Sequence, residues 1–230
     1  MLHYLDNLRG YFLNDFARED SFVGTRLCSW QSFQCCGAAI DSRFFRETIK
    51  LDKQIMARIT LIRHGKTEIP PHEKHDFDRS LILRGQRNSS AVGAFLREHK
   101  MLPQLVLVSP AARTRETYEF MKPQWPDGIP VKFIDELYEA SADTLLSVIL
   151  NNCGVQSNVA VIGHNPSLVI LLNHMVADNH HAAFNGRVTE HDLSYFPTCC
   201  FADIGFESPQ VTDIVSRSGK LLSMKRVREL

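Results

Sequence analysis

The sequence lacks an excess of charge of either sign, because 26 Lys and Arg residues are balanced by 26 Asp and Glu residues. A neutral chain has no overall field that would draw it to nucleic acid or to an anionic membrane surface. We therefore expect neither as a partner. Any attraction for an anion must come from a local group of cations.

The sequence also lacks a long apolar run near its start and any CxxC pair. Six charged residues interrupt the early apolar segments before they reach the length of a signal peptide or membrane span. They are Asp6, Arg9, Asp15, Arg18, Glu19 and Asp20. Two adjacent cysteine pairs are poor disulfide geometry, and no Cys–His spacing of a zinc site repeats. These absences predict a soluble cytoplasmic protein with reduced thiols and no bound metal.

A change of pattern near Met56 divides the chain into two parts. Residues 1–55 hold one candidate amphipathic helix, with Leu5 and Phe16 at its ends, and then no sustained period. From residue 56 onward, short apolar strands alternate with helical segments. The prediction is an N-terminal extension of unknown role, 1–55, followed by one domain, 56–230. Two interpretations of the extension stay open: a genuine helical segment, or an upstream stretch that precedes a natural start at Met56.

Three segments of the domain share one plan, in which a buried strand runs into a polar turn and then a helix. The strands are expected over 59–62, 105–108 and 159–162. Helices are expected to follow the second and third strands, capped by Ser109 with Pro110 and by Asn165. Such alternation predicts a three-layer α/β/α domain with a mostly parallel sheet. All three turns then lie at the carboxyl edge of the sheet, where ligands bind.

The segments between these units are expected to cover the sheet and complete it. Helices are predicted over 85–99 and 143–151, the latter capped by Ser141. Two later strands, over 201–206 and 211–215, are predicted to form an antiparallel edge.

Four side chains of the polar turns carry the candidate chemistry. They are Arg63 and His64 after the first strand, Arg113 near the second, and His164 after the third. Arginine offers paired donors that match phosphate oxygens, so this pocket is suited to a phosphoryl dianion. No carboxylate cluster suited to Mg²⁺ lies in these turns, so arginines would neutralise the charge of the transition state. A neutral imidazole can then act as the nucleophile.

Three runs resemble a known family. Leu61-Ile62-Arg63-His64-Gly65-Lys66-Thr67 is similar to the signature of the histidine phosphatase superfamily, which also contains the cofactor-dependent phosphoglycerate mutases. Residues 109–117 and 163–166 resemble its second arginine and second histidine motifs. Gly-His-Asn-Pro-Ser-Leu, Phe196-Pro197-Thr198 and the closing Arg228-Glu229-Leu230 resemble the compact phosphohistidine phosphatases of the SixA type. The resemblance covers about residues 56–230.

The resemblance implies a phosphoglycerate mutase-like fold and a role for each site residue. His64 would be the phosphorylated nucleophile, and Arg63, Arg113 and His164 would bind the phosphoryl group, without a cofactor. Larger members protonate the leaving group with a glutamate in a Leu-x-Glu segment. Glu139 matches that position, and Glu136 is its rival; a solvated surface charge is the alternative for both.

The short spacing between the motifs leaves little chain for a lid, and an uncovered site favours a bulky substrate. The leading hypothesis is a metal-independent phosphatase that removes phosphate from protein phosphohistidine, with a histidine-phosphotransfer domain as a candidate partner. The alternatives are a phosphatase of small phosphorylated metabolites and a non-catalytic module that binds phosphorylated partners. The presence of both His64 and His164 favours chemistry, because binding alone would need only the arginines.

Overall fold

The computed structural model describes residues 57–69, 75–176, 193 and 195–230. The helix predicted between Leu5 and Phe16 lies outside the described residues. The domain boundary predicted near residue 56 falls at their edge and stays a prediction.

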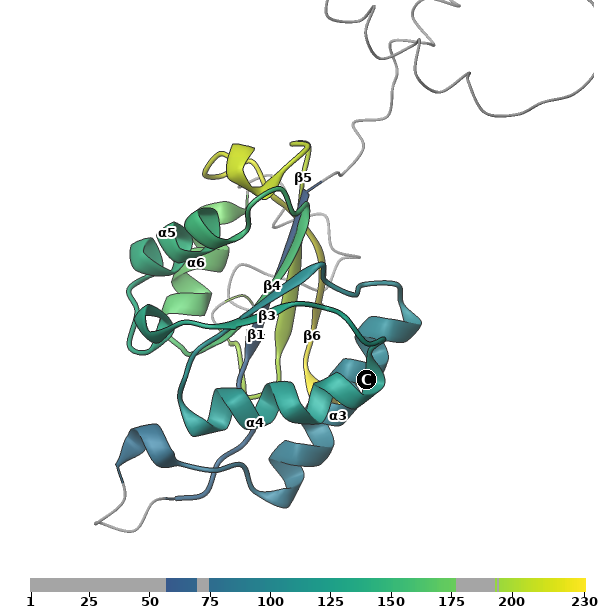
Figure 1. Cartoon of the computed structure of the whole chain (residues 1–230), viewed down its shortest axis with the longest axis vertical. Helices are drawn as coiled ribbons and strands as arrows, with labels where there is room; N and C mark the ends of the chain where they lie inside the picture. The colour runs from purple at the N-terminus through teal and green to yellow at the C-terminus, as the bar shows by residue number, and fades with distance from the viewer. Residues whose placement is uncertain (1–56, 70–74, 177–192, 194) are drawn as a thin grey trace, which may run out of the picture. The chain divides into compact units, whose positions relative to one another are not determined.

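Six strands form one sheet in the order β3-β2-β4-β1-β5-β6 (Figure 1). Their bounds are β1 Ala57–Arg63, β2 Leu105–Val108, β3 Val131–Phe133, β4 Asn158–Gly163, β5 Phe201–Phe206 and β6 Lys220–Lys225. The neighbours among β3, β2, β4 and β1 pair in parallel, whereas β5 and β6 complete the sheet as antiparallel strands. The predicted α/β fold with a mostly parallel sheet is confirmed.

Alternate residues of the central strands pack against opposite faces of the sheet. Ile59 and Leu61 of β1 belong to one apolar cluster, whereas Ile62 belongs to the other. Buried strands that are covered on both sides have to be apolar along their whole length, which explains the continuous apolar runs of the sequence. The sheet is therefore the middle layer of three.

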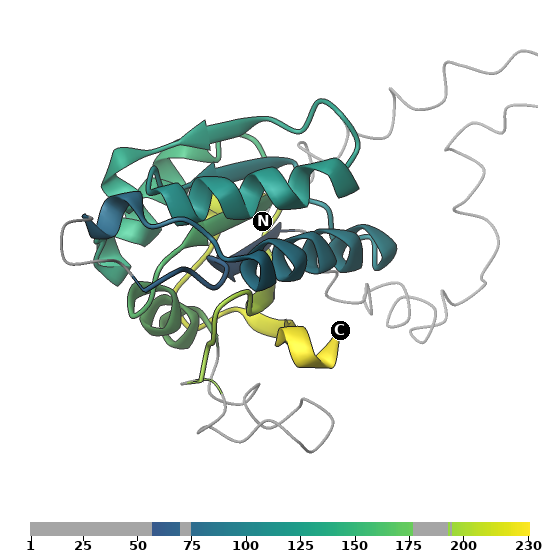
Figure 2. The ribbon, with the colours of Figure 1, turned by 90° about the horizontal axis from the view of Figure 1, so that it is seen from below.

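Two pairs of helices form the outer layers (Figures 1 and 2). Helices α5 (Ala142–Asn152) and α6 (Ser167–Met175) bury residues such as Ile149 and Leu171 in the first cluster. Helices α3 (Leu83–Glu98) and α4 (Ala112–Met121) bury residues such as Leu96 and Met121 in the second. Helices α3 and α5 confirm the segments predicted over 85–99 and 143–151. The hydroxyl of Ser141 accepts a hydrogen bond from the Thr144 amide, as a helix cap should.

The other two predicted caps are wrong, because both side chains are used elsewhere. Helix α4 begins at Ala112, not at Pro110, and the Ser109 hydroxyl contacts a ring nitrogen of His164. Helix α6 begins at Ser167, and the Asn165 amide donates to the carbonyl oxygen of Phe196 at 3.0 Å. Residues expected to begin helices instead join neighbouring turns to one another.

The last predicted strand is also misplaced. Residues 211–215 contain a 3₁₀ turn, Val211–Asp213, whose hydrogen bonds are local; the Asp213 amide donates to the Gln210 carbonyl. Only Val211 of this turn is buried. The antiparallel edge is instead completed by β6, and the short edge strand β3 was not predicted.

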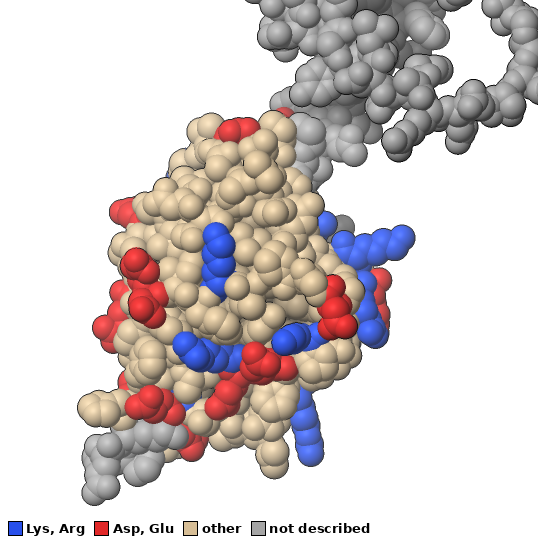
Figure 3. Space-filling model, viewed as in Figure 1, with Lys and Arg blue, Asp and Glu red and all other residues tan. Residues whose placement is uncertain are grey.

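None of the helices in the described ranges is long and apolar enough to cross a bilayer. Acidic and basic side chains mix on the face shown in Figure 3. Cys153, Cys199 and Cys200 are buried free thiols, and burial raises the pKa of Cys199 to about 11 and of Cys200 to about 12. Burial raises the pKa of the Cys153 thiol as well, so these three thiols are protonated at neutral pH. The other three cysteines lie outside the described residues.

Candidate functional site

Strand register places the three polar turns side by side. Arg63, the last residue of β1, lies opposite Gly163, the last residue of β4, so that His64 and His164 both follow directly. The His64 amide donates to the Gly163 carbonyl at 3.2 Å. On the other side of β4, the Ser109 amide donates to the Ile162 carbonyl at 3.1 Å. Parallel pairing of three buried strands thus gathers their following turns at one edge.

The His64 ring is held so that one nitrogen stays available. Its Nδ1 lies 2.8 Å from the Gly65 carbonyl oxygen, which can only accept a hydrogen bond. A neutral ring in this position carries its proton on Nδ1 and has a lone pair on Nε2. The Gly65 amide is anchored in turn by the Thr117 hydroxyl at 2.8 Å, which ties this turn to α4.

The Arg63 guanidinium is held by the main chain that precedes β5. Its Nη1 donates to the Phe196 carbonyl oxygen at 2.8 Å, the same oxygen that accepts from Asn165. Among the described residues, Arg63 Nε is buried without a hydrogen-bond partner. One carbonyl oxygen therefore links the end of β1 to the turn that follows β4.

The His164 ring lies near the His64 ring and is held by a contact with a buried serine. The two ring centroids are 5.3 Å apart. His164 Nε2 lies 2.8 Å from the hydroxyl of the fully buried Ser109, whereas Nδ1 is buried and has no partner among the described residues. A buried, unpaired ring nitrogen is costly in an apolar setting and is suited to a polar ligand.

Burial keeps both histidines neutral. The pKa of His64 is lowered to about 4, mainly by burial and also by the charges of Arg113 and Arg63, although its hydrogen bond to Gly65 opposes the shift. The pKa of His164 is lowered to about 3, mainly by burial and also by the charge of Arg113. Burial, and to a lesser degree Arg113, lowers the pKa of Arg63 as well. At neutral pH the site thus holds two uncharged imidazoles and two guanidinium groups near them.

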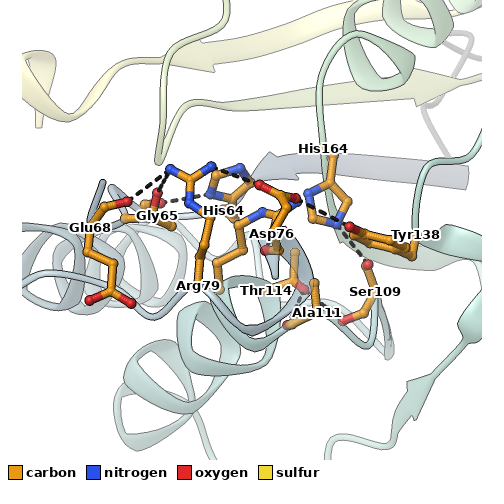
Figure 4. A network of polar contacts seen from close by, with 12 residues as sticks. His64, Gly65, Glu68, Asp76, Arg79, Ser109, Ala111, Thr114, Tyr138 and His164 are labelled. Atoms are coloured by element: carbon orange, nitrogen blue, oxygen red, sulfur yellow. Dashed lines mark hydrogen bonds and ion pairs between the residues drawn. The ribbon is translucent and has the colours of Figure 1, made fainter. Parts of the chain in front are cut away.

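The Arg113 side chain, which is 8% exposed, makes an ion pair that the sequence did not predict. Its Nη2 lies 2.9 Å from Asp76 Oδ2, and its Nη1 donates to the Asp76 carbonyl oxygen at 2.6 Å. Asp76 lies in a 3₁₀ turn, Asp76–Asp78. Figure 4 shows its carboxylate between Arg79, which donates to Oδ1 at 2.9 Å, and Tyr138, which donates to Oδ2 at 3.3 Å. The rings of Tyr138 and His164 also meet edge to face, with centroids 5.8 Å apart.

Comparison with known proteins identifies this arrangement. Residues 59–148 match the sequence profile of the histidine phosphatase superfamily, branch 1. The candidate phosphohistidine phosphatase SixA from Agrobacterium tumefaciens is 26% identical, with a TM-score of 0.58 over 75% of this chain and 99% of that one. Residues 59–148, the region that this profile matches, belong to the histidine phosphatase superfamily. The family predicted from the motifs is confirmed, and so is the likeness to proteins of the SixA type.

Two further comparisons are weaker, because one is of lower identity and the other covers only part of each chain. The candidate SixA from Nakamurella multipartitia is 23% identical, with a TM-score of 0.59 over 75% of this chain and 98% of that one, and it supports the fold alone. An uncharacterized protein of Mycobacterium leprae is 32% identical over 112 residues, which is 46% of this chain and 66% of the relative. Across such curated relatives, this chain spans between 41% and 66% of their own lengths.

The histidine phosphatase domain brings four of the five predicted site residues together. Arg63, His64, Arg113 and His164 meet at one sheet edge, whereas Glu139 is exposed and makes no hydrogen bond or ion pair with those four. Its rival Glu136 is also exposed. Between them, Tyr138 is the side chain that reaches the site. The role of Glu139 as an acid stays a prediction, and so does the absence of a bound metal.

Sequence reasoning missed Asp76, Arg79 and Tyr138, and treated Ser109 only as a helix cap. Tyr138 lies inside the Leu-x-Glu segment that drew attention to Glu139, so the segment was relevant but the residue was not the expected one. Asp76 and Arg79 gave no signal, because charged residues of an irregular turn are usually solvated.

Proposed function

We propose that this histidine phosphatase domain is a phosphatase that needs no metal and passes a phosphoryl group through His64. The observation that carries the proposal is the pairing of two neutral imidazoles, 5.3 Å apart, with guanidinium groups beside them. His64 Nε2 offers a lone pair. The buried Nδ1 of His164 and Nε of Arg63 have no hydrogen-bond partner among the described residues and can each bind a polar ligand. These groups match the oxygens of one phosphoryl group.

In the first step, His64 Nε2 forms a bond to phosphorus as the bond between phosphorus and the leaving group breaks. The leaving group keeps the electron pair of the broken bond. The Nδ1 proton of His64 remains on the ring, where the Gly65 carbonyl stabilises the positive charge that develops. In the second step, water attacks phosphorus, orthophosphate departs and His64 regains its lone pair. Arg63, Arg113 and His164 hold the phosphoryl oxygens in both steps.

A phosphohistidine side chain of a protein is the substrate we propose. Between α4 and α5, the chain contains only β3 and two short 3₁₀ turns, so no helical subdomain is inserted there. Such a site is suited to a bulky substrate, and imidazole leaves readily without a dedicated acid. A histidine-phosphotransfer domain is one candidate partner; a small phosphorylated metabolite is the alternative substrate. The cytoplasmic location remains a prediction from the sequence.

The test is a chemical trap for phosphorylated His64. Wild-type protein that is quenched during turnover of p-nitrophenyl phosphate should carry acid-labile, alkali-stable phosphate. His64→Ala should carry none and should lose turnover by a factor of about 10³ or more, because the nucleophile is gone. His99→Ala, which removes an exposed histidine at the end of α3, is the matched control and should behave as wild type. Full activity of His64→Ala would refute the assignment.

A further inference from the structure

The ion pair between Asp76 and Arg113 is an unexpected feature for a site that binds an anion. Both terminal nitrogens of Arg113 are engaged by Asp76, one by its carboxylate and one by its carbonyl oxygen. A phosphoryl group that binds Arg113 has to share or displace that carboxylate. Asp76 is itself half exposed, so an incoming ligand can reach its carboxylate from solvent.

The surroundings of Asp76 keep it ionised. The hydrogen bond from Arg79 lowers the pKa of this carboxyl, and the charge of Arg113 and the hydrogen bond from Tyr138 act in the same direction. An ionised carboxylate accepts hydrogen bonds and has no proton to give. It also repels a second anion, so it weakens the binding of free phosphate and of anionic leaving groups.

Resting on the proposed function, we propose that Asp76 selects substrates that carry their phosphoryl group on a protonated imidazole ring, which leaves as neutral imidazole. Its carboxylate accepts a hydrogen bond from the ring N–H of the substrate phosphohistidine. This contact stabilises the imidazolium form and sets the preference of the site for phosphohistidine over phosphate esters.

The transfer step balances with this contact in place. The substrate ring carries the phosphoryl group on one nitrogen and a proton on the other. The N–P bond breaks, its electron pair returns to that nitrogen, and a neutral imidazole leaves with its proton still in place. His64 Nε2 gains the phosphoryl group and the ring becomes an imidazolium, whose Nδ1–H still donates to the Gly65 carbonyl oxygen. One positive charge thus passes from ring to ring, with an acceptor beside each ring: Asp76 for the substrate and Gly65 for the enzyme.

A phosphate ester lacks this advantage. The p-nitrophenolate group leaves as an anion and offers no N–H, so Asp76 contributes only repulsion. Removing the charge of Asp76 should therefore act in opposite directions on the two substrates.

The experiment compares Asp76→Asn with Asp78→Asn, which removes the same charge from the same 3₁₀ turn. Asp78 is exposed and the structure gives its carboxylate no ion pair with a described residue, so it is the matched control. We would measure kcat/KM for a phosphohistidine peptide and for p-nitrophenyl phosphate, and the inhibition constant of vanadate. In Asp76→Asn, kcat/KM for the phosphohistidine peptide divided by kcat/KM for p-nitrophenyl phosphate should fall about tenfold or more, because a charged hydrogen bond is lost. Vanadate should inhibit more strongly. Asp78→Asn should leave the ratio unchanged.

The outcomes separate this inference from the proposed function. A wild-type protein that hydrolyses neither substrate would refute the proposed function, and the inference with it. If wild type is active but Asp76→Asn keeps the same ratio, the inference alone fails. Weaker inhibition by vanadate together with equal losses on both substrates would mean that Asp76 only positions Arg113, and this would also overturn the proposal.

Discussion

Ser109→Ala tests how the site orients His164. The Ser109 hydroxyl is fully buried and lies 2.8 Å from His164 Nε2. For Nδ1 to donate to a phosphoryl oxygen, the neutral ring has to carry its proton on Nδ1, and Nε2 then accepts a hydrogen bond from Ser109. Removing the hydroxyl leaves Nε2 buried without this donor, so the ring loses its preference for the productive tautomer.

The expected loss of stability in Ser109→Ala follows from the loss of one neutral hydrogen bond and from one buried group that is left unpaired. Together these should lower the free energy of unfolding by about 2 kcal/mol. If about 1.4 kcal/mol of the same interaction orients the ring in the transition state, kcat/KM falls about tenfold. The loss should appear mainly in kcat, because the bond to the phosphoryl oxygen strengthens as charge develops.

Steady-state kinetics with p-nitrophenyl phosphate and urea unfolding measure the two effects separately. Ser167→Ala is the matched control, since the Ser167 hydroxyl donates to the main-chain oxygen of His164 at 3.0 Å and does not touch the ring. It should lower stability but leave kcat near the wild-type value. Wild-type kcat in Ser109→Ala, or an equal loss in both variants, would refute the proposed orientation.

Three other predictions concern packing and protonation. Gly85→Ala would place a Cβ 2.2 Å from the Lys66 carbonyl oxygen, so it should lower both the free energy of unfolding, by about 3 kcal/mol or more in urea titration, and the activity. Asp203→Ala would remove the buried partner of Arg58 and Thr60, and thermal unfolding should report a loss of about 2–4 kcal/mol. NMR of the ring carbons should find His64 and His164 neutral from pH 8 to 5, since their pKa values lie at about 4 and 3. Because the unfolded chain binds these protons near pH 6.5, acidification from pH 6.5 toward 4 should lower stability by up to about 1.4 kcal/mol per pH unit for each ring.

The central sheet of the fold was predictable because its strands show as short apolar runs in the sequence. The runs over 59–62, 105–108 and 159–162 are continuous and apolar, and only a sheet covered on both sides buries such runs completely. Once they are parallel neighbours, the residues after them have to meet, which is why His64 and His164 could be placed together. Strand β3 escaped prediction because Lys132 and Phe133 are exposed and the strand has only three residues.

The parts of the site that were missed depend on long-range contacts. Asp76 reaches Arg113 from an irregular turn 37 positions earlier in the chain, and no spacing rule predicts where such a turn lies. Ser109 has the residue type and position of a helix cap, but the competing partner, His164, comes from another strand. In both cases the sequence shows the residue and only the tertiary structure shows its partner.

The carbonyl oxygen of Phe196 is an anchor that a change of side chain cannot remove. Arg63 and Asn165 both depend on this oxygen, yet it belongs to the peptide backbone, which every amino acid shares. A single-residue replacement at position 196 would change the buried ring and leave the shared acceptor chemically intact. Natural drift in this stretch can therefore alter its side chains without erasing the anchor itself, provided that the path of the chain is preserved.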